Sequence, residues 1–370
     1  MDFRLGELFC GAGGIGYAAK KTRFKTDIGE FSINHAWSTD FNEDACKTYR
    51  RNICPDAPET VVHEDIRKLD FSVLAKISSI NALAFGFPCN DFSSVGEKKG
   101  IDGVFGALYS YGVRALERFT PQWFLAENVG GLRNSNDGRA FKQILHELSK
   151  DYDVVPHLYK FEKYGVPQAR HRIIIIGTRK DLGLKFKVPS PAPFADADVS
   201  ARTALTVPPI PFDAANQERT NQSQSVMDRL SHIKPGENAW TADIPANLRL
   251  NVKSVTISSI YRRLDPDKPA YTVTGSGGGG THVYHWEENR ALTNRERARL
   301  QTFPDDFVFE GSKESVRKQI GMAVPPKGVS VIFEAVLKTF AGIDYLSIPH
   351  NIELDKTLFD DSDSNATMPA

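Results

Sequence analysis

The chain has 370 residues, and its 46 Lys and Arg balance its 46 Asp and Glu, so a uniformly basic nucleic-acid coat protein is excluded. Hydrophobic residues make up 41% of the chain, enough for the cores of two domains or of one domain with a large insertion. No apolar run reaches the roughly 18–20 residues of a membrane span, and no signal-peptide pattern follows Met1, so we expect a cytoplasmic protein without membrane contact. None of the four cysteines stands in a CxxC pair, so we expect neither a disulfide framework nor a bound metal.

The first half of the chain alternates short apolar runs with helical periodicity. The runs at 3–9, 80–85, 123–126 and 173–176 have the length and bulk of buried strands, and the last consists of four isoleucines. Apolar residues recur at helical spacing over 108–119 and 141–148. Strands that alternate with helices predict an α/β fold, with a mostly parallel sheet and helices on both faces.

The character of the sequence changes after about residue 180. Prolines and polar residues fill 188–247 and predict irregular structure, whereas helical periodicity returns at 291–303 and 316–340. Thr293 and Glu296 have the spacing of a capping box at the start of a helix. We therefore predict four parts: a first domain (1–180), a second domain (181–290), a segment that returns to the first (291–345) and a disordered tail (346–370).

A glycine-rich loop follows the first predicted strand, and residues 11–16, GAGGIG, fit the GxGxxG pattern. Asp40, at the end of the strand-like segment 35–39, is placed to accept hydrogen bonds from ribose hydroxyls. Phe41 could stack on an adenine, and Asp65 could accept from its amino group. A dinucleotide and an adenosyl ligand without a pyrophosphate need the same contacts, and an ordinary tight turn has the same glycines. The loop alone therefore leaves the ligand open.

A cysteine, an acid and two arginines follow other predicted strands. Cys89 lies in the Gly-Pro turn of GFPCNDFS (86–93), at the carboxyl end of a strand, where parallel sheets place their chemistry. A thiolate is a strong nucleophile. Glu127 follows the next strand, and together with Cys89 it suggests a pair of an acid and a nucleophile. Arg170 and Arg172 can project on one face of an extended segment toward a pyrimidine, a phosphate or a carboxylate.

Taken in order, these residues resemble the motifs of the C5-cytosine DNA methyltransferases over 1–180 and about 290–340. The sequences LFCGAGG (8–14), GFPCNDFS, ENV and QARHR look like the family's cofactor, nucleophile, acid and arginine motifs, and 291–304 and 319–325 are similar to its last two. The resemblance implies a Rossmann-like methyltransferase fold with S-adenosylmethionine as cofactor. It implies cofactor contacts from Phe9, Gly11, Gly13, Gly14, Asp40, Phe41, Asp65, Ile66, Pro88, Leu108 and Met322.

Two positions depart from the family's pattern. Asn90 stands where glutamine usually follows the cysteine, which keeps an amide on a shorter side chain. Met322 stands where asparagine usually follows the glycine, which removes a polar contact near the cofactor. Neither change alters the expected nucleophile or acid.

The resemblance also implies a mechanism and a substrate. Cys89 would attack C6 of a flipped-out cytosine, Glu127 would engage N3 and the exocyclic amine, and Arg172, or else Arg170, would hold O2. Residues 181–290 would form a β-rich target recognition domain that reads a specific duplex DNA sequence. The DNA contacts would come from Asn90, Ser93, Lys98, Arg262, Gly277 and Thr281. A compact enzyme of this kind is typical of a prokaryotic modification enzyme that acts as a monomer alongside a cognate restriction endonuclease.

Several alternatives stay open. A cytosine-C5 methyltransferase that acts on tRNA uses the same motifs, although 181–290 is a sizeable recognition region. A catalytically silent DNA-binding relative would not need the intact Cys89 and Glu127. An NAD-dependent oxidoreductase would leave the cysteine turn and both arginines unexplained. The glycines at 277–280 are equally typical of a loop that binds nothing.

Overall fold

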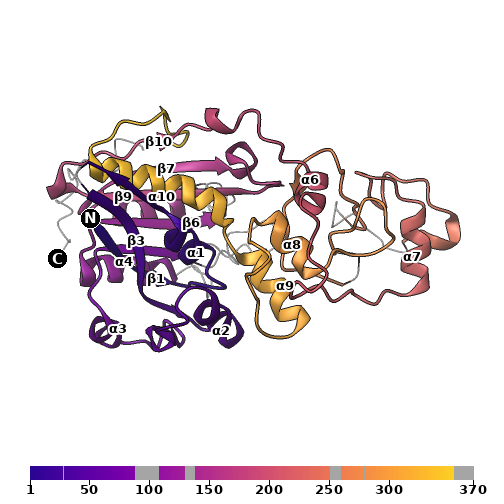
Figure 1. Ribbon diagram of the computed structural model, residues 1–370, viewed down its shortest axis with the longest axis horizontal. Helices are drawn as coiled ribbons and strands as arrows, with labels where there is room; N and C mark the ends of the chain where they lie inside the picture. The colour runs from indigo at the N-terminus through magenta and orange to yellow at the C-terminus, as the bar shows by residue number, and fades with distance from the viewer. Residues whose placement is uncertain (28, 88–107, 130–137, 251–259, 279, 354–370) are drawn as a thin grey trace, which may run out of the picture.

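The computed structural model describes residues 1–27, 29–87, 108–129, 138–250, 260–278 and 280–353. Figure 1 shows an elongated molecule with a larger lobe built on a β-sheet and a smaller lobe that projects from it. Helices α6 (Ala201–Thr206), α8 (Asn294–Leu300) and α9 (Lys313–Met322) lie where the lobes meet, and α7 (Gln224–Ser231) lies near the far end.

The sheet of the larger lobe has eight strands in the order β2-β3-β1-β5-β6-β9-β7, with β4 paired to β3. The pairs β1–β3, β3–β4, β1–β5 and β5–β6 are parallel, whereas β2–β3, β6–β9 and β7–β9 are antiparallel. The strands are β1 (Asp2–Leu8), β2 (Arg23–Thr26), β3 (Gly29–Asp40), β4 (Val61–His63), β5 (Ala82–Gly86), β6 (Trp123–Val129), β7 (Tyr152–Lys160) and β9 (His171–Arg179).

Helices cover both faces of this sheet, as predicted. One face packs on α1 (Gly14–Lys21) and α10 (Pro326–Ala341), and the other on α3 (Phe71–Ile77), α4 (Tyr109–Phe119) and α5 (Arg139–Leu148). The four isoleucines of β9 divide between the faces, because Ile173 and Ile175 join one core while Ile174 and Ile176 join the other. Their burial on both sides is therefore confirmed.

The expectation of parallel pairing fails at the isoleucine strand. Only residues 161–170 connect β7 to β9, which is shorter than the dozen or more residues that a crossover to a parallel neighbour requires. The chain therefore turns back, and β9 runs antiparallel to both β7 and β6. The sheet is mixed, with its parallel part at β4-β3-β1-β5-β6.

The smaller lobe is irregular, as predicted, but the part of 181–290 that the structure describes is not β-rich. Among the described residues of that span, the only strands are β10 (Val188–Pro189) and β11 (Ala270–Tyr271), each of two residues. Prolines recur through the span and cannot donate to a strand ladder. The lobe instead has a small core of its own, separate from the sheet. It consists of Leu230, Ile233, Ile244, Tyr261, Tyr284 and Ala291.

Buried arginines take the place of strand partners in this lobe. The buried side chains of Arg263 and Arg295 donate hydrogen bonds to backbone carbonyls of other loops, and the partly exposed Arg299 donates to carbonyls at the surface. Buried carbonyls need such partners where no ladder supplies them. The acceptors are the carbonyls of Leu230, His285 and Glu288 for Arg263, of Ala215, Pro304 and Phe307 for Arg295, and of Ala204, Pro208 and Pro209 for Arg299.

The predicted start of the second domain and the predicted start of the tail both lie too early in the chain. Strand β10 pairs antiparallel with β12 (Ser347–Ile348), and Val188 belongs to a core of the larger lobe. Ile352 is buried in the core on the other face. The prediction of a disordered tail is therefore wrong for residues 346–353.

Residues 313–341 are long and apolar enough to span a membrane, but 72% of that apolar window is buried inside the protein.

Candidate cofactor and catalytic site

The glycine loop lies between β1 and α1 and turns sharply. Phe9, Gly11 and Gly13 have φ values of 55°, 53° and 89°, in the left-handed region that favours glycine. A Cβ on Gly14 would lie 2.3 Å from the carbonyl oxygen of Val324, so the loop packs directly against the segment before α10. The glycines therefore serve both a tight turn and a close contact between distant segments.

Asp40, at the end of β3, fixes the loop from the side. Its carboxylate accepts a hydrogen bond from the backbone N–H of Gly11 (2.8 Å) and another from that of Asn42 (2.9 Å). Burial raises the pKa of the Asp40 carboxyl, and the two backbone donors oppose this effect. The predicted ribose acceptor thus lies beside the predicted glycine loop, because β1 and β3 are parallel neighbours whose carboxyl ends meet.

A cleft of about 480 Å³, open to solvent, lies at this edge of the sheet. Six of the residues predicted to bind the cofactor line it, together with three that were not predicted. Phe41 is 69% exposed there, although it is a large aromatic residue, so its ring is available to a flat ligand. The predicted residues are Phe9, Asp40, Phe41, Asp65, Ile66 and Leu108, and the others are Thr39, Glu64 and Arg67.

Asp65 is not the free acceptor that the sequence suggested. The guanidinium of Arg67 contacts both carboxylate oxygens, at 2.5–3.0 Å. Hydrogen bonding from Arg67 lowers the pKa of Asp65 to about 2, so this carboxylate is ionised at neutral pH. Sequence reasoning missed Arg67, although an acid and an arginine two residues apart were visible.

Met322 ends α9 and is 70% exposed. It lies two residues before Val324, whose carbonyl contacts Gly14, so this departure from the family's pattern is adjacent to the glycine loop.

The predicted acid lies at the carboxyl end of the neighbouring strands. Glu127 of β6 is the register partner of Gly86, the last residue of β5. Its Oε1 lies 2.8 Å from Nε of Arg172, and these side chains are only 12% and 13% exposed. Burial raises the pKa of Glu127, while the charges of Arg172 and Arg170 oppose the rise. Asn128 donates to the carbonyl of Phe87 (3.2 Å) and so fixes the start of the cysteine turn to β6.

The two arginines of QARHR contact different groups. Arg172 pairs with Glu127, whereas Arg170 is only 1% exposed and its Nη1 and Nη2 donate to the carbonyls of Val273 (3.2 Å) and Gly321 (2.9 Å). The expectation that both side chains face one ligand is not met. Arg170 instead connects the larger lobe to the loop after β11 and to α9.

Five of the predicted site residues lie outside the described residues: Pro88, Cys89, Asn90, Ser93 and Lys98. Their roles therefore remain predictions. No group of three or more His, Cys, Asp and Glu side chains able to hold a metal is found in the described ranges.

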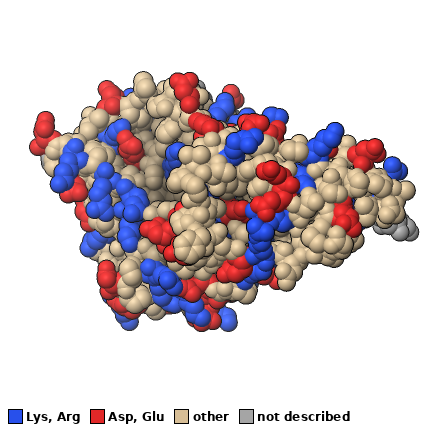
Figure 2. Space-filling model, turned by 45° about the vertical axis from the view of Figure 1, so that its right-hand side comes forward, with Lys and Arg blue, Asp and Glu red and all other residues tan. Residues whose placement is uncertain are grey.

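The other predicted DNA contacts lie in the smaller lobe. The guanidinium of Arg262 lies 4.6 Å from the ring centre of Tyr271, and the hydroxyl of Thr281 donates to the carbonyl of Gly278. On the face drawn in Figure 2, Lys and Arg are interspersed with Asp and Glu, so this face carries no broad surface of one charge.

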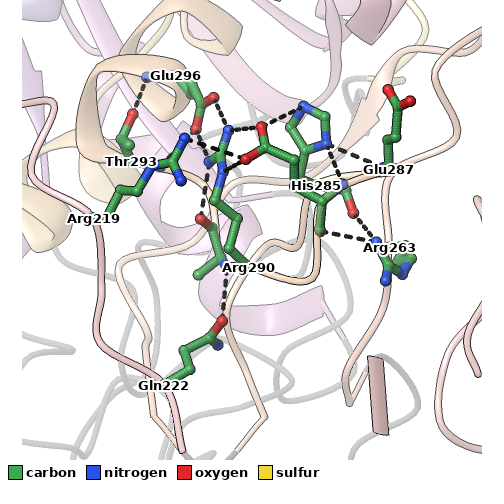
Figure 3. Close-up of polar contacts among 10 residues, drawn as sticks. Arg219, Gln222, Arg263, His285, Glu287, Arg290, Thr293 and Glu296 are labelled. Carbon is green, nitrogen blue, oxygen red and sulfur yellow. Dashed lines mark hydrogen bonds and ion pairs between the residues drawn. The ribbon is translucent and has the colours of Figure 1, made fainter. Parts of the chain in front are cut away.

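An ion-pair network joins this lobe to α8 (Figure 3). Arg290 lies between Glu288 and Glu296 and contacts both carboxylates at 2.8 Å. Glu296 also accepts from the backbone N–H of Thr293, so the predicted capping box is confirmed. Arg219 reaches the same network through Glu288. The network fixes residues 288–290 to the start of α8.

Comparison with known proteins gives consistent matches over nearly the whole chain. A family model described as C-5 cytosine-specific DNA methylase matches residues 3–338. The type II methyltransferase M.BbvI of Brevibacillus brevis is 58% identical over 355 residues, which cover 94% of each chain. The type II methyltransferase M.NgoFVII of Neisseria gonorrhoeae is 37% identical, over 90% of this chain and 86% of the relative.

Two solved structures share the fold at low sequence identity. A prophage-encoded protein of E. coli has a TM-score of 0.65 and 23% identity, and the match covers 92% of this chain and 99% of that one. S. pombe Dnmt2 methyltransferase has a TM-score of 0.60 and 17% identity, over 92% of this chain and 100% of the other. These likenesses concern the fold alone.

Proposed function

The chain belongs to the C-5 cytosine-specific DNA methylase family and is a DNA methyltransferase, and from that premise we propose that it methylates C5 of one cytosine within a specific duplex sequence. The identity with type II methyltransferases supports a role as the modification enzyme of a restriction–modification system. We propose further that it acts as a monomer in the cytoplasm, beside a cognate endonuclease.

The cleft beside the glycine loop fits S-adenosylmethionine. Asp40 offers carboxylate oxygens for ribose hydroxyls, and the exposed ring of Phe41 offers a stacking surface for adenine. Within the described structure, nothing lies within 4 Å of the place that a Cβ on Gly11 would occupy, so a ligand has room to approach the backbone of the loop there. When bound, this cofactor supplies an electrophilic methyl group.

The Glu127–Arg172 pair is the observation that carries the proposed chemistry. The Cys89 thiolate would form a bond to C6 of the cytosine while Glu127 holds a proton at N3, which makes C5 nucleophilic. Burial raises the pKa of Glu127, so this acid is suited to engage N3. Arg172 would hold Glu127 and the pyrimidine O2, and Arg170 would act as a positioning residue. After methylation of C5, loss of the C5 proton and cleavage of the S–C6 bond restore the base.

Covalent trapping tests this proposal. In duplex DNA that carries 5-fluorocytosine at the target position, fluorine replaces the C5 proton, so the C6 adduct cannot be resolved. We expect the wild-type enzyme to form a denaturation-resistant complex with this DNA in the presence of the cofactor, and Cys89→Ser to form none. Cys54→Ser changes a buried cysteine outside the site and should still form the complex. An adduct formed by Cys89→Ser would overturn the assignment of the nucleophile.

A further inference from the structure

Three basic side chains gather behind the glycine-rich loop of the smaller lobe. They are Arg297 of α8, Arg317 of α9 and His282, which follows the loop. Arg297 is only 1% exposed, and its Nη2 lies 3.3 Å from Nδ1 of His282. The Nε atoms of Arg297 and Arg317 are both buried, and neither has a hydrogen-bond partner.

In the part of the chain that the structure describes, no carboxylate lies within ion-pair distance of Arg297 or Arg317, and Glu296 acts on Arg297 only from a longer distance. By contrast, Arg290 and Arg299 are paired with Glu296 and Asp305. Burial, and then the charge of Arg317, lower the pKa of Arg297 to about 10. Burial, and then the charges of Arg297 and Arg317, lower the pKa of His282 to about 4. Buried like charges with unused donors are costly unless an anion compensates them.

The loop is fitted closely to this cluster. A Cβ on Gly277 would lie 2.4 Å from Nε of Arg317 and 2.8 Å from Cε1 of His282, so the backbone at 277 lies directly against the guanidinium. A Cβ on Gly321 would lie 2.0 Å from the backbone nitrogen of Gly275, so α9 and the loop are in contact at a second place. Only glycine at 277 leaves Arg317 in this position.

We propose that Arg317 binds a backbone phosphate of the DNA that lies over residues 274–278, an inference that rests on the proposed function. A guanidinium suits this task because its planar donors match two phosphate oxygens. Arg317 is partly exposed and can reach DNA, whereas the more deeply buried Arg297 is a positioning residue behind it. A phosphate at this point would compensate the cluster and would fix the recognition loop to α9.

Salt-dependent DNA binding tests this assignment. Arg317→Met removes the charge and keeps much of the length of the side chain. Lys318→Met is the matched control, because Lys318 is the next residue of α9 and its exposed side chain pairs with Glu314. The dissociation constant would be measured for a cognate and an unrelated duplex between about 50 and 200 mM salt, after circular dichroism has shown that each variant is folded.

We expect Arg317→Met to weaken both duplexes about equally, by roughly tenfold at low salt. The slope of log affinity against log salt should become less steep by about one, and Lys318→Met should change neither quantity. Arg317→Lys, which keeps the charge, should retain most of the slope. If the methionine variant does not fold, Arg317→Gln, which also removes the charge, is used with the same expectation.

An unchanged slope in folded Arg317→Met would overturn the phosphate contact. A loss of preference for the cognate duplex at an unchanged slope would also overturn it, since it would show a role in loop structure alone. Wild-type enzyme that binds DNA with the full salt slope but methylates no cytosine would contradict the proposed function and leave this inference standing.

Discussion

Glu7 is a buried acid near the end of β1, and its contacts determine where one proton is held. The Thr60 hydroxyl donates to the carbonyl of Ala57 (2.6 Å), so Nε2 of His35 must donate to Thr60 (2.7 Å). Tyr49 then lies between Nδ1 of His35 (3.2 Å) and Oε2 of Glu7 (2.9 Å) with a single hydroxyl hydrogen. The chain is satisfied either by an imidazolium with a carboxylate or by a neutral imidazole with a protonated Glu7.

Burial favours the neutral arrangement, because it raises the pKa of Glu7 to about 8 and lowers that of His35 to about 4. Between pH 6.5 and 8, Glu7 is then protonated in the folded state and ionised in the unfolded chain. We expect the free energy of unfolding to fall in this window by about 1.4 kcal/mol per pH unit on account of Glu7. Below pH 6.5, His35 is protonated in the unfolded chain but not in the folded state, which makes the free energy of unfolding rise with pH. The range from pH 6.5 to 8 therefore shows the effect of Glu7 without that of His35.

Urea unfolding of wild type and Glu7→Gln at several pH values from 6.5 to 8 checks this expectation. The glutamine mimics the protonated acid, so it should flatten the slope and make the protein more stable toward pH 8. Equal slopes for the two proteins would show that Glu7 is ionised in the folded state. The ring of Tyr49 packs against Gly13 and Gly16, so this hydrogen-bonded chain adjoins the glycine loop.

Asp40 is the residue on which cofactor affinity should depend most directly. Its carboxylate is positioned by Gly11 and Asn42, and a hydrogen bond to a charged acceptor contributes about 1.5–3 kcal/mol. Asp40→Ala should therefore weaken S-adenosylmethionine binding by roughly one to two decades, measured by calorimetry. Glu43→Ala, an exposed acid at the start of α2 (Glu43–Asn52), is the control and should leave affinity unchanged. Normal affinity in Asp40→Ala would move the ribose site elsewhere.

At the scale of elements, the sequence predicted the strands and helices whose apolar residues recur at regular spacing. The strands at 3–9, 80–85 and 123–126 and the helices at 108–119 and 141–148 match β1, β5, β6, α4 and α5 to within a few residues. Strand-end positions also brought Asp40, Phe41 and Asp65 into one cleft. The direction of β9 could not be predicted from its isoleucines, because it depends on the length of the connection before it.

Partners of charged residues were less predictable. Arginines are usually surface residues, and nothing in the sequence marks particular ones as different. In the folded chain, however, specific groups accept hydrogen bonds from Arg67, Arg170 and Arg295. Such contacts depend on how loops distant in sequence meet. The expectation of a β-rich smaller lobe came from the family resemblance, and the described residues of that lobe depart from it. Its carbonyls find arginine donors where strand partners were expected.

Arg295 should be essential to the stability of the smaller lobe. Arg295→Met would leave the carbonyls of Ala215, Pro304 and Phe307 without their donors, and we expect a loss of about 3 kcal/mol in the free energy of unfolding. Arg202→Met removes an exposed arginine paired with Asp267 and should cost no more than about 1 kcal/mol. Urea midpoints compare the two variants, and equal losses would contradict the role given to Arg295.

At the scale of the whole molecule, the two lobes contain different parts of the proposed sites. The cleft and the Glu127–Arg172 pair belong to the larger lobe, while the separate core around Leu230 and Tyr284 belongs to the smaller one. We expect sequence specificity to be a property of the smaller lobe. Replacing 217–291 with the matching segment of a relative of different specificity should redirect methylation to the relative's site.

The exchange is chosen to respect the packing. The exchanged segment contains all six residues of the small core. It leaves in place Asn216 and Arg295, which are joined by a hydrogen bond from the backbone N–H of Arg295 to the carbonyl of Asn216. The ion pair of Arg290 and Glu296 crosses its end, so a relative with the same two residues is preferred. Methylation of the original site by an active chimera would show that the larger lobe carries the specificity.

Bisulfite sequencing of DNA from cells that express the protein tests the central claim most directly. We predict that one cytosine within a single recurring duplex sequence becomes fully resistant to conversion. We also predict that purified enzyme transfers labelled methyl groups from S-adenosylmethionine to duplex DNA and not to tRNA. Complete conversion of every genomic cytosine, together with methylation of tRNA by the purified enzyme, would contradict it.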